Sequence, residues 1–213
     1  MNFKQLVNDF LVETQMDDPV ATVLGQTDDA AQAVQWVRDA WTQVQRAERW
    51  DFLWNRAYFT TTAGKSEYTP IEQNRGVGSK IDITTFRNGN NGTHLAPMDY
   101  HRLAVPSRSG SPSMVALLPN DSVVFNATPK EPAVYLYESW ATPVVLTDDL
   151  DTPSAPAQFH KAIVWLAVTN YAREQGAEWN GLYTAATRDF NSVYSDMQRF
   201  YLPQMLPKVP LIY

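Results

Sequence analysis

The spacing of hydrophobic and polar positions changes twice along the chain, from a helical period to an alternating one and back. Near the N-terminus, apolar residues recur every three or four positions and predict one amphipathic helix to about Thr14. These apolar residues are Phe3, Leu6, Val7, Phe10 and Leu11. Pro19 and Gly25 then interrupt the pattern. Asp29, followed by Gln32, resembles a capping box, so we expect a second helix from about Asp29.

The second predicted helix leads into a stretch with four of the chain's seven tryptophans, Trp36, Trp41, Trp50 and Trp54. On a helical wheel, its apolar residues lie within an arc of roughly 160°, and Trp36 and Trp41 belong to that arc. We therefore expect these two side chains in a helical core. Trp50 and Trp54 fall where the helix ends, and we expect them to seal its junction with the segment that follows.

The middle of the chain, residues 56–147, predicts short β-strands. Strand-like segments such as KIDITTF and PAVYLYESW are separated by Pro, Asn, Asp and Gly. Two Asn-Gly pairs, Asn88–Gly89 and Asn91–Gly92, predict a tight hairpin. The segment DYHRLAV predicts one helical turn between strands. Five to seven short antiparallel strands would form a small sandwich or an open barrel.

A helical period returns in the last part of the chain. One face of the third predicted helix and one face of the fourth are apolar, and the two helices are separated by a turn near Gly176. The apolar positions are Phe159, Ala162, Ile163, Leu166 and Ala167 in the third helix, and Leu182, Ala186, Phe190, Val193, Met197 and Phe200 in the fourth. Pro203 ends the fourth helix.

Neither helical end of the chain can bury its apolar stripe alone. The sequence therefore predicts an α+β protein with a four-helix core, residues 1–55 and 153–202, built from both chain ends. Residues 56–147 would form an inserted antiparallel β lobe. Residues 203–213 would form an extended C-terminal arm, because Pro203, Pro207 and Pro210 exclude a helix there.

Composition narrows the possible functions. The chain is 44% hydrophobic and carries a formal net charge of −6, so it can bury a core but is unsuited to general adhesion to nucleic acid. It has no cysteine, which excludes disulfides and thiolate chemistry and suits a reducing cytoplasm. We expect no membrane span, because no run of about 18 apolar residues occurs.

Motifs that would indicate a reaction are incomplete. The segment AGKS at residues 63–66 resembles the end of a phosphate loop, but Phe59 stands where the first glycine is needed. His94, Asp99 and His101 lack the regular spacing of metal ligands. We therefore expect no catalytic residue, no metal site and no cofactor. An enzyme or sugar-binding module with a site around Asp99 and His101 remains an open alternative.

Two stretches carry a more specific pattern. GQTDDAAQAVQWVRDAWTQVQRAERWDF combines a Gly-Gln loop with a Trp-Val and Ala-Trp helix that ends in Trp-Asp-Phe. DTPSAPAQFHKAIVWLAVTNYA begins its helix with Pro156, Phe159 and His160. Both stretches resemble the landmarks of head-to-tail adaptor (connector) proteins of tailed bacteriophages. The resemblance covers both helical ends, roughly half of the chain, and the β region matches only in position and size.

The resemblance implies a non-enzymatic virion protein at the neck between capsid and tail, assembled in the host cytoplasm. Such adaptors form a homo-oligomeric ring, typically of twelve copies, below the portal protein. The ring extends the channel through which double-stranded DNA passes without sequence-specific binding, and it provides the docking platform for tail or nozzle proteins. An alternative within the virion is a tail-side completion or tail tube protein, which ring size and the bound partner would distinguish.

Two groups of residues are candidates for contacts with a neighbouring subunit or the portal. Arg38, Arg46 and Arg49 lie outside the apolar arc of the second helix, beside Asp39 and Glu48. The second group is the apolar set of the C-terminal arm, which a purely solvated tail would not need. Its members are Met205, Leu206, Val209, Leu211, Ile212 and Tyr213.

Overall fold

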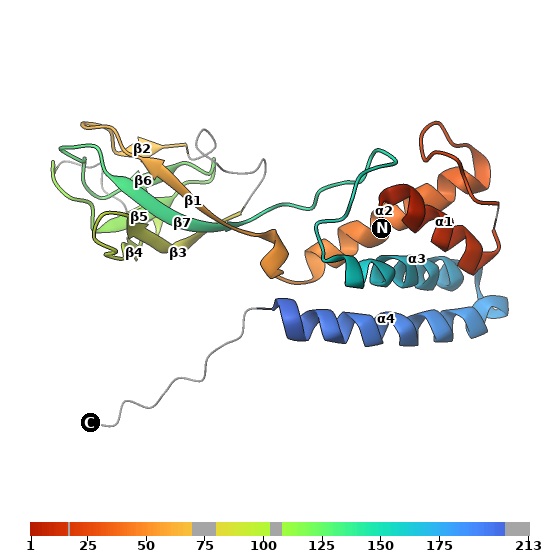
Figure 1. Ribbon diagram of the computed structural model, residues 1–213. Helices are drawn as coiled ribbons and strands as arrows, with labels where there is room; N and C mark the ends of the chain where they lie inside the picture. The colour runs from red at the N-terminus through yellow and green to blue at the C-terminus, as the bar shows by residue number, and fades with distance from the viewer. Residues whose placement is uncertain (17, 70–79, 103–107, 203–213) are drawn as a thin grey trace, which may run out of the picture. The chain divides into compact units, whose positions relative to one another are not determined.

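The computed structural model describes residues 1–16, 18–69, 80–102 and 108–202. The chain divides into two compact units, each with its own core. The helical unit comprises Met1–Leu53 and Pro143–Tyr213, and the β unit comprises Trp54–Thr142 (Figure 1). The predicted α+β class is confirmed. The predicted C-terminal arm, residues 203–213, lies outside the described residues.

Helix α1 (Phe3–Thr14) has the bounds and the buried face that the apolar spacing predicts. A capping box, which the sequence analysis missed, fixes its first turn. The Gln5 amide N–H donates to Asn2 Oδ1 at 2.9 Å, and the Asn2 amide N–H donates to Gln5 Oε1 at 2.8 Å. Two backbone donors at the helix start are thus satisfied locally.

Helix α2 (Asp28–Ala47) starts one residue before the predicted position, and its predicted capping box is wrong. Thr27 is the N-cap residue and its side chain caps no amide. Trp41 is buried, as expected, but Trp36 is only half-buried. On the helical wheel Trp36 lies at the edge of the apolar arc, which agrees with its partial exposure. The wheel cannot show that Trp36 borders a surface pocket next to the end of the third helix.

The two tryptophans that follow α2 differ in exposure. Trp50 is fully buried, and its indole N–H donates to the Val44 carbonyl oxygen at 2.6 Å. This bond folds the chain back onto the last turn of α2, and the 3-10 helix η1 (Asp51–Leu53) follows. Trp54 begins the first strand and is 39% exposed.

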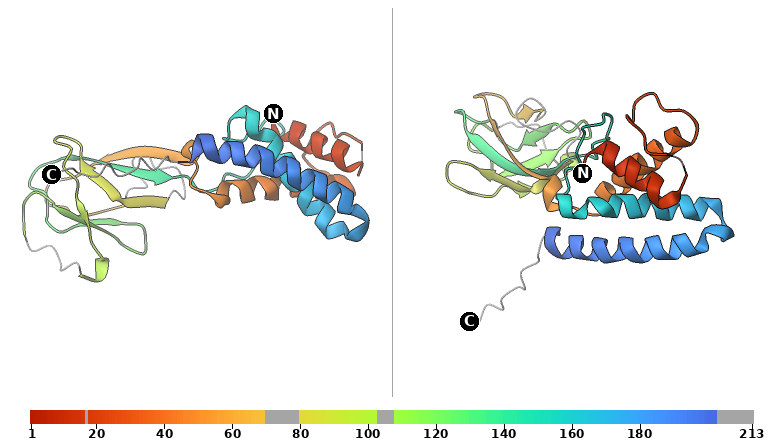
Figure 2. Two further views of the ribbon diagram at one scale, coloured as in Figure 1. Left: turned by 90° about the horizontal axis from the view of Figure 1, so that it is seen from below. Right: turned by 45° about the vertical axis from the view of Figure 1, so that its right-hand side comes forward.

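Helix α3 (His160–Gln175) is the central element of the helical unit. It follows η4 (Ala157–Phe159), and α1 and α2 pack on one side of it. Helix α4 (Asn180–Tyr201) follows η5 (Ala177–Trp179) and packs along the other side (Figures 1 and 2). Gly176 permits the reversal between α3 and α4 because its φ of +93° is accessible to glycine.

The predicted apolar stripe of α4 is only partly covered. Ala186 and Met197 are buried, whereas Phe190 and Val193 are half-buried and Phe200 is 69% exposed. The four helices form one core, as predicted, and α4 packs mainly along α3. The sequence period gives the apolar face of α4 but not the number of neighbours that cover it.

The described strands of the β unit form two sheets. The first has the order β1-β7-β3 and is antiparallel throughout. The second has the order β2-β6-β5-β4. The strands are β1 (Trp54–Thr60), β2 (Glu67–Tyr68), β3 (Lys80–Asn88), β4 (Ala96–Pro97), β5 (Met114–Leu117), β6 (Val123–Phe125) and β7 (Val134–Trp140).

One strand pair corrects the expectation of purely antiparallel strands: β4 and β5 are parallel, with Ala96 opposite Met114. Parallel neighbours need a long connection, and residues 98–113 supply it. The predicted helical turn is confirmed in this connection as η3 (Tyr100–Arg102). The predicted hairpin also reverses the chain, since Arg87 and His94 form an antiparallel bridge. Its returning strand is reduced to that bridge.

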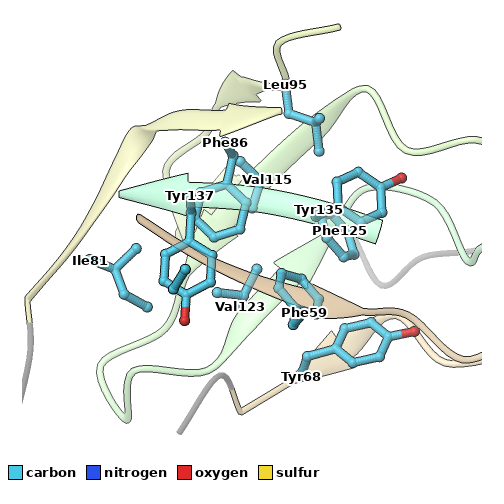
Figure 3. Packing of buried hydrophobic residues seen from close by; sticks show 11 residues of the cluster. Phe59, Tyr68, Ile81, Phe86, Leu95, Val115, Val123, Phe125, Tyr135 and Tyr137 are labelled. Carbon is cyan, nitrogen blue, oxygen red and sulfur yellow. The ribbon is translucent and has the colours of Figure 1, made fainter. Parts of the chain in front are cut away.

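Aromatic side chains fill the space between the two sheets (Figure 3). Phe59 lies at the centre, with ring centroids 6.0 Å from Phe125 and 5.9 Å from Tyr135. Phe86 stacks on Tyr137 at 5.2 Å. Sheets that pack face to face are about 10 Å apart, which large side chains are suited to fill.

Candidate assembly surface

A segment that returns from the β unit binds α2 through side chains of that helix. We call Pro143–Asp151 the return strap. Gln45 Nε2 donates to the Val144 carbonyl at 3.1 Å, and the Val144 amide donates to Gln45 Oε1 at 2.9 Å. Arg38 Nε donates to the Leu146 carbonyl at 2.9 Å. One side of α2 is thus occupied within its own unit.

The acidic end of the return strap supports the start of α1. The Phe3 amide donates to the Asp151 carbonyl at 2.7 Å, so a backbone donor that the helix leaves unpaired is satisfied. Asp149 Oδ1 accepts a 2.6 Å bond from the Val23 amide. The amides of Asp148 and Thr147 donate to the Asp151 carboxylate and hold the pKa of that group below its usual value. These carboxylates therefore have structural partners.

His160, a landmark of the second sequence pattern, is a buried anchor. Its Nε2 lies 2.8 Å from the Ala155 carbonyl, so this nitrogen carries the proton. Its Nδ1 lies 2.8 Å from the amino nitrogen of Met1 and accepts from it. Burial lowers the pKa of His160, because the charged imidazolium would lose its hydration. The neutral ring thus connects the chain start, the segment before η4 and α3.

The predicted interface arginines are not equivalent. Arg38 is half-buried and engaged with the return strap. Arg46 and Arg49 are exposed at the C-terminal end of α2. Between them, Glu48 accepts a 3.2 Å hydrogen bond from Gln198 of α4. The structure therefore leaves Arg46 and Arg49 on an outward surface, and a role in subunit contacts remains a prediction for them.

The helical unit also has a surface pocket that the sequence analysis did not identify. It has a volume of about 370 Å³ and lies between the first half of α2 and the end of α3. Its lining residues are Gln32, Gln35, Trp36, Asp39 and Glu174. The available signal was the pair of polar residues Gln32 and Asp39, which lie four positions before and three positions after Trp36 on the helix.

Residues of the rival β-lobe site lie on the surface of the β unit. Asp99 and His101 are both exposed, and Asp99 Oδ1 accepts from the His101 amide at 3.0 Å as part of a local turn. A pocket of about 340 Å³ in the β unit is lined instead by residues such as Pro129, Lys130 and Tyr135. In the described ranges, no group of three His, Cys, Asp or Glu side chains could hold a metal ion.

The apolar residues of the predicted arm, from Met205 to Tyr213, lie outside the described residues. In the part of the chain that the structure does describe, no helix has the length and apolar character needed to cross a bilayer. The best-defined features of the helical unit are packing contacts, a strap and outward charged surfaces. They belong to a protein of the α+β class.

Comparison with known families gives the same class more specifically. A family described as SU10 adaptor protein matches residues 1–205. The chain therefore belongs to the SU10 adaptor protein family, a family of phage head-to-tail adaptors. Such adaptor proteins are structural and not enzymatic. No curated protein matches the chain in a sequence comparison.

Proposed function

We propose that this protein assembles as a ring below the portal of a tailed phage, extends the DNA channel and provides the docking platform for the tail. The observation that carries the proposal is the family match across residues 1–205, which includes both helical ends and the β unit. The net charge of −6 suits a channel wall past which DNA slides, because clustered cations would retain the phosphates. A ring of twelve copies at the virion neck is part of the proposal.

The outward end of α2 is the proposed contact surface between subunits or with the portal. A ring interface joins two different surfaces of the same protein, and closure depends on the angle between them. Arg46 lies in the last turn of α2 and Arg49 lies two residues beyond its end, and both are exposed, so this surface can meet a neighbour without disturbing the core. Arg38 contributes by holding the return strap against α2.

Charge reversal tests this surface. The variant Arg46→Glu, Arg49→Glu should keep the thermal unfolding of the wild type, because both side chains are exposed, but should lose ring formation on portal particles in electron micrographs. A matched control, Lys130→Glu with Arg188→Glu, makes the same change of charge at exposed positions elsewhere. Normal decoration of portals by the Arg46, Arg49 variant would show that this surface is only solvated.

The C-terminal arm is the second proposed contact. Helix α4 ends at Tyr201, so removal of residues 203–213 deletes no described element. We expect the truncated chain to fold and to lose stable attachment to the portal or to a neighbouring copy. A variant with residues 203–213 replaced by a Gly/Ser segment of equal length controls for length. Assembly of the truncated chain into infectious tailed particles would contradict the role of the arm.

The same experiments separate the proposal from its nearest alternative. A tail-side completion or tube protein would form a ring that co-purifies with tail components and leaves isolated portals bare. An adaptor should decorate isolated portals before any tail component is added. The order of addition therefore decides the level at which the protein attaches.

A further inference from the structure

The pocket of the helical unit combines an aromatic wall with two carboxylates. Trp36 is half-buried and lies against Tyr171, with ring centroids 6.4 Å apart and an interplanar angle of 77°. This contact fixes one side of the Trp36 ring and leaves the ring at the pocket of about 370 Å³. Asp39 comes from the next turn of α2, and Glu174 comes from the last turn of α3.

The pocket is negatively charged, and none of the described residues that line it is cationic. Gln35 Nε2 donates to Asp39 Oδ1 at 2.8 Å, which orients that carboxylate. Glu174 forms no ion pair or hydrogen bond with any of the described residues. Two neighbouring cations of the same unit already have partners other than the two carboxylates. Arg38 donates through Nε to the Leu146 carbonyl and through Nη1 to Gln35 Oε1 at 3.3 Å, and Arg173 Nη2 donates to Asn170 Oδ1 at 3.3 Å. The pocket is therefore open to a cation from outside the unit.

A guanidinium group fits this chemistry better than other cations. It is planar, so it can stack on the Trp36 ring while its edge donates to a carboxylate. Its donors point in several directions in one plane, which suits two carboxylates from different helices together with the side-chain oxygen of Gln32. An ammonium group would supply the charge but not the stacking surface.

The source of the guanidinium follows from charge and symmetry. Arg46 is on the same outward side of α2 as Asp39, since seven residues make almost two helical turns. Contact between identical surfaces is two-fold and cannot build a cyclic ring of many copies. A ring therefore needs an arginine from a different surface. The helical unit carries nine basic and sixteen acidic residues, whereas the β unit carries eight basic and seven acidic ones.

Among the described arginines of the β unit, two are exposed and free of an ion pair. Arg56 pairs with Glu138 at 3.7 Å and lies over the Trp54 ring, and Arg87 is half-buried. Arg102 and Arg108 remain, and both are exposed. We propose that the pocket formed by Trp36, Asp39 and Glu174 binds the guanidinium of Arg102 or Arg108 from the β unit of a second copy. This inference rests on the proposed ring.

The first experiment tests the pocket without assembly. Arginine amide is titrated into the isotope-labelled protein, and the indole N–H signal of Trp36 and the side-chain amide signals of Gln32 and Gln35 are followed by NMR. Citrulline amide, the neutral isostere of arginine amide, is the matched ligand control. We expect saturable shifts with arginine amide and about tenfold weaker binding with citrulline amide. Equal binding of both probes would overturn the assignment of a cation site.

Two variants locate the binding of arginine amide. Asp39→Asn with Glu174→Gln should weaken binding about tenfold or more, because both charges are removed with little change of shape. Glu178→Gln removes a carboxylate that is exposed and does not line the pocket, and it should leave binding unchanged. Unchanged binding in the first variant, or an equal loss in both, would overturn the proposed site.

The second experiment identifies the occupant. Arg102→Gln with Arg108→Gln should leave the titration unchanged and reduce ring formation, and each single variant shows which arginine is used. The pair Asp39→Arg with Glu174→Arg should lose rings, and so should the pair Arg102→Glu with Arg108→Glu. A chain that carries all four changes should form rings again. Normal rings from the Arg102→Gln, Arg108→Gln chain would overturn the role of the second copy. If the wild-type chain forms no ring even on portals, the proposed function fails, while the titration still decides the pocket.

Discussion

The two units of the molecule solve the same packing problem with different side chains. In the helical unit, alanine and valine occupy the places where helices meet, as with Ala33, Ala40 and Ala167, and their small size lets helices approach closely. In the β unit, a cluster of aromatic rings around Phe59 fills the space between two sheets. The difference follows from geometry, because helices can meet through small residues whereas packed sheets leave a wider gap.

The units also differ in charge and in how their polar groups are used. By residue counts, the helical unit has a net charge of −7 and the β unit a net charge of +1. The helical unit uses several long polar side chains to bind its own backbone, as Gln45 and Arg38 do with the return strap. In the helical unit, these polar side chains hold the return strap in place. The opposite signs of the two net charges favour a contact between the helical unit of one copy and the β unit of another.

The largest expected effect is in the β unit. Phe59→Ala removes a buried ring that contacts five other aromatic rings. We expect the free energy of unfolding to fall by an amount near the top of the range of about 3–5 kcal/mol. Chemical denaturation with near-ultraviolet circular dichroism measures it. Tyr58→Ala, at an exposed neighbouring position of β1, is the control and should cost much less. Equal losses would show that the core is not centred on Phe59.

In the helical unit, Trp41→Ala should also destabilise strongly. Trp41 is buried and lies over Phe52 with ring centroids 6.4 Å apart, so truncation should cost about 3–4 kcal/mol. Trp36→Ala, in the same helix but half-buried, is the matched control and should cost less. If amides of β1 and β7 keep their hydrogen-exchange protection in Trp41→Ala, the two units unfold separately. Loss of protection in both units together would show that they share one folding transition.

Some features of these two units follow from local sequence and others do not, for a physical reason. The bounds of α1 follow from local apolar spacing and the end of α3 follows from the turn at Gly176, so the sequence was sufficient for these features. The exposure of Trp36 and Phe200 depends on which neighbours cover a helix face, and spacing within one helix does not contain that information. The same holds for the parallel pairing of β4 with β5, because the residues of one short strand do not show which strand lies beside it or in which direction.

The contacts of the candidate surface were the least predictable. Arg38 was expected outside the apolar arc, yet it binds a backbone carbonyl about a hundred positions further along the chain, as Gln45 also does. The pocket beside Trp36 is formed by two helices that are far apart in sequence. Local sequence could identify the charged residues of α2 but not which of them are used internally. Arg38 is used internally, whereas Arg46 of α2 and Arg49 just beyond its end are exposed, and Arg49 also has a contact within the chain.

A smaller effect is expected at the return strap. Gln45→Leu removes both bonds to Val144, and Val144 is 60% exposed, so water can replace the lost partners in part. We expect a loss of about 1–2 kcal/mol in unfolding free energy. Faster hydrogen exchange should appear at the amides of residues 144–148 and not in the β unit. A variant with wild-type exchange in the strap would show that these bonds do not hold it.

The smallest effect is a dependence on pH that we expect in the helical unit alone. The lowered pKa of His160 means that the folded state resists protonation. The contribution of neutral His160 is complete above its usual pKa of 6.5 and is lost as the pH falls through the lower pKa of the folded state. His160→Gln can keep both hydrogen bonds but cannot titrate. Its unfolding free energy should therefore fall less below pH 6.5, and an identical pH profile would contradict the assignment.

The most direct test of the central claim is electron microscopy of the purified chain mixed with purified portal particles of its own phage. The account predicts an added ring of density on one end of the portal, with the helical units of neighbouring copies in a repeating contact and an open channel along the axis. Bare portals, with the chain remaining in the unbound fraction at concentrations that saturate a functional portal–adaptor pair, would contradict the assignment of this protein as the ring that joins head and tail.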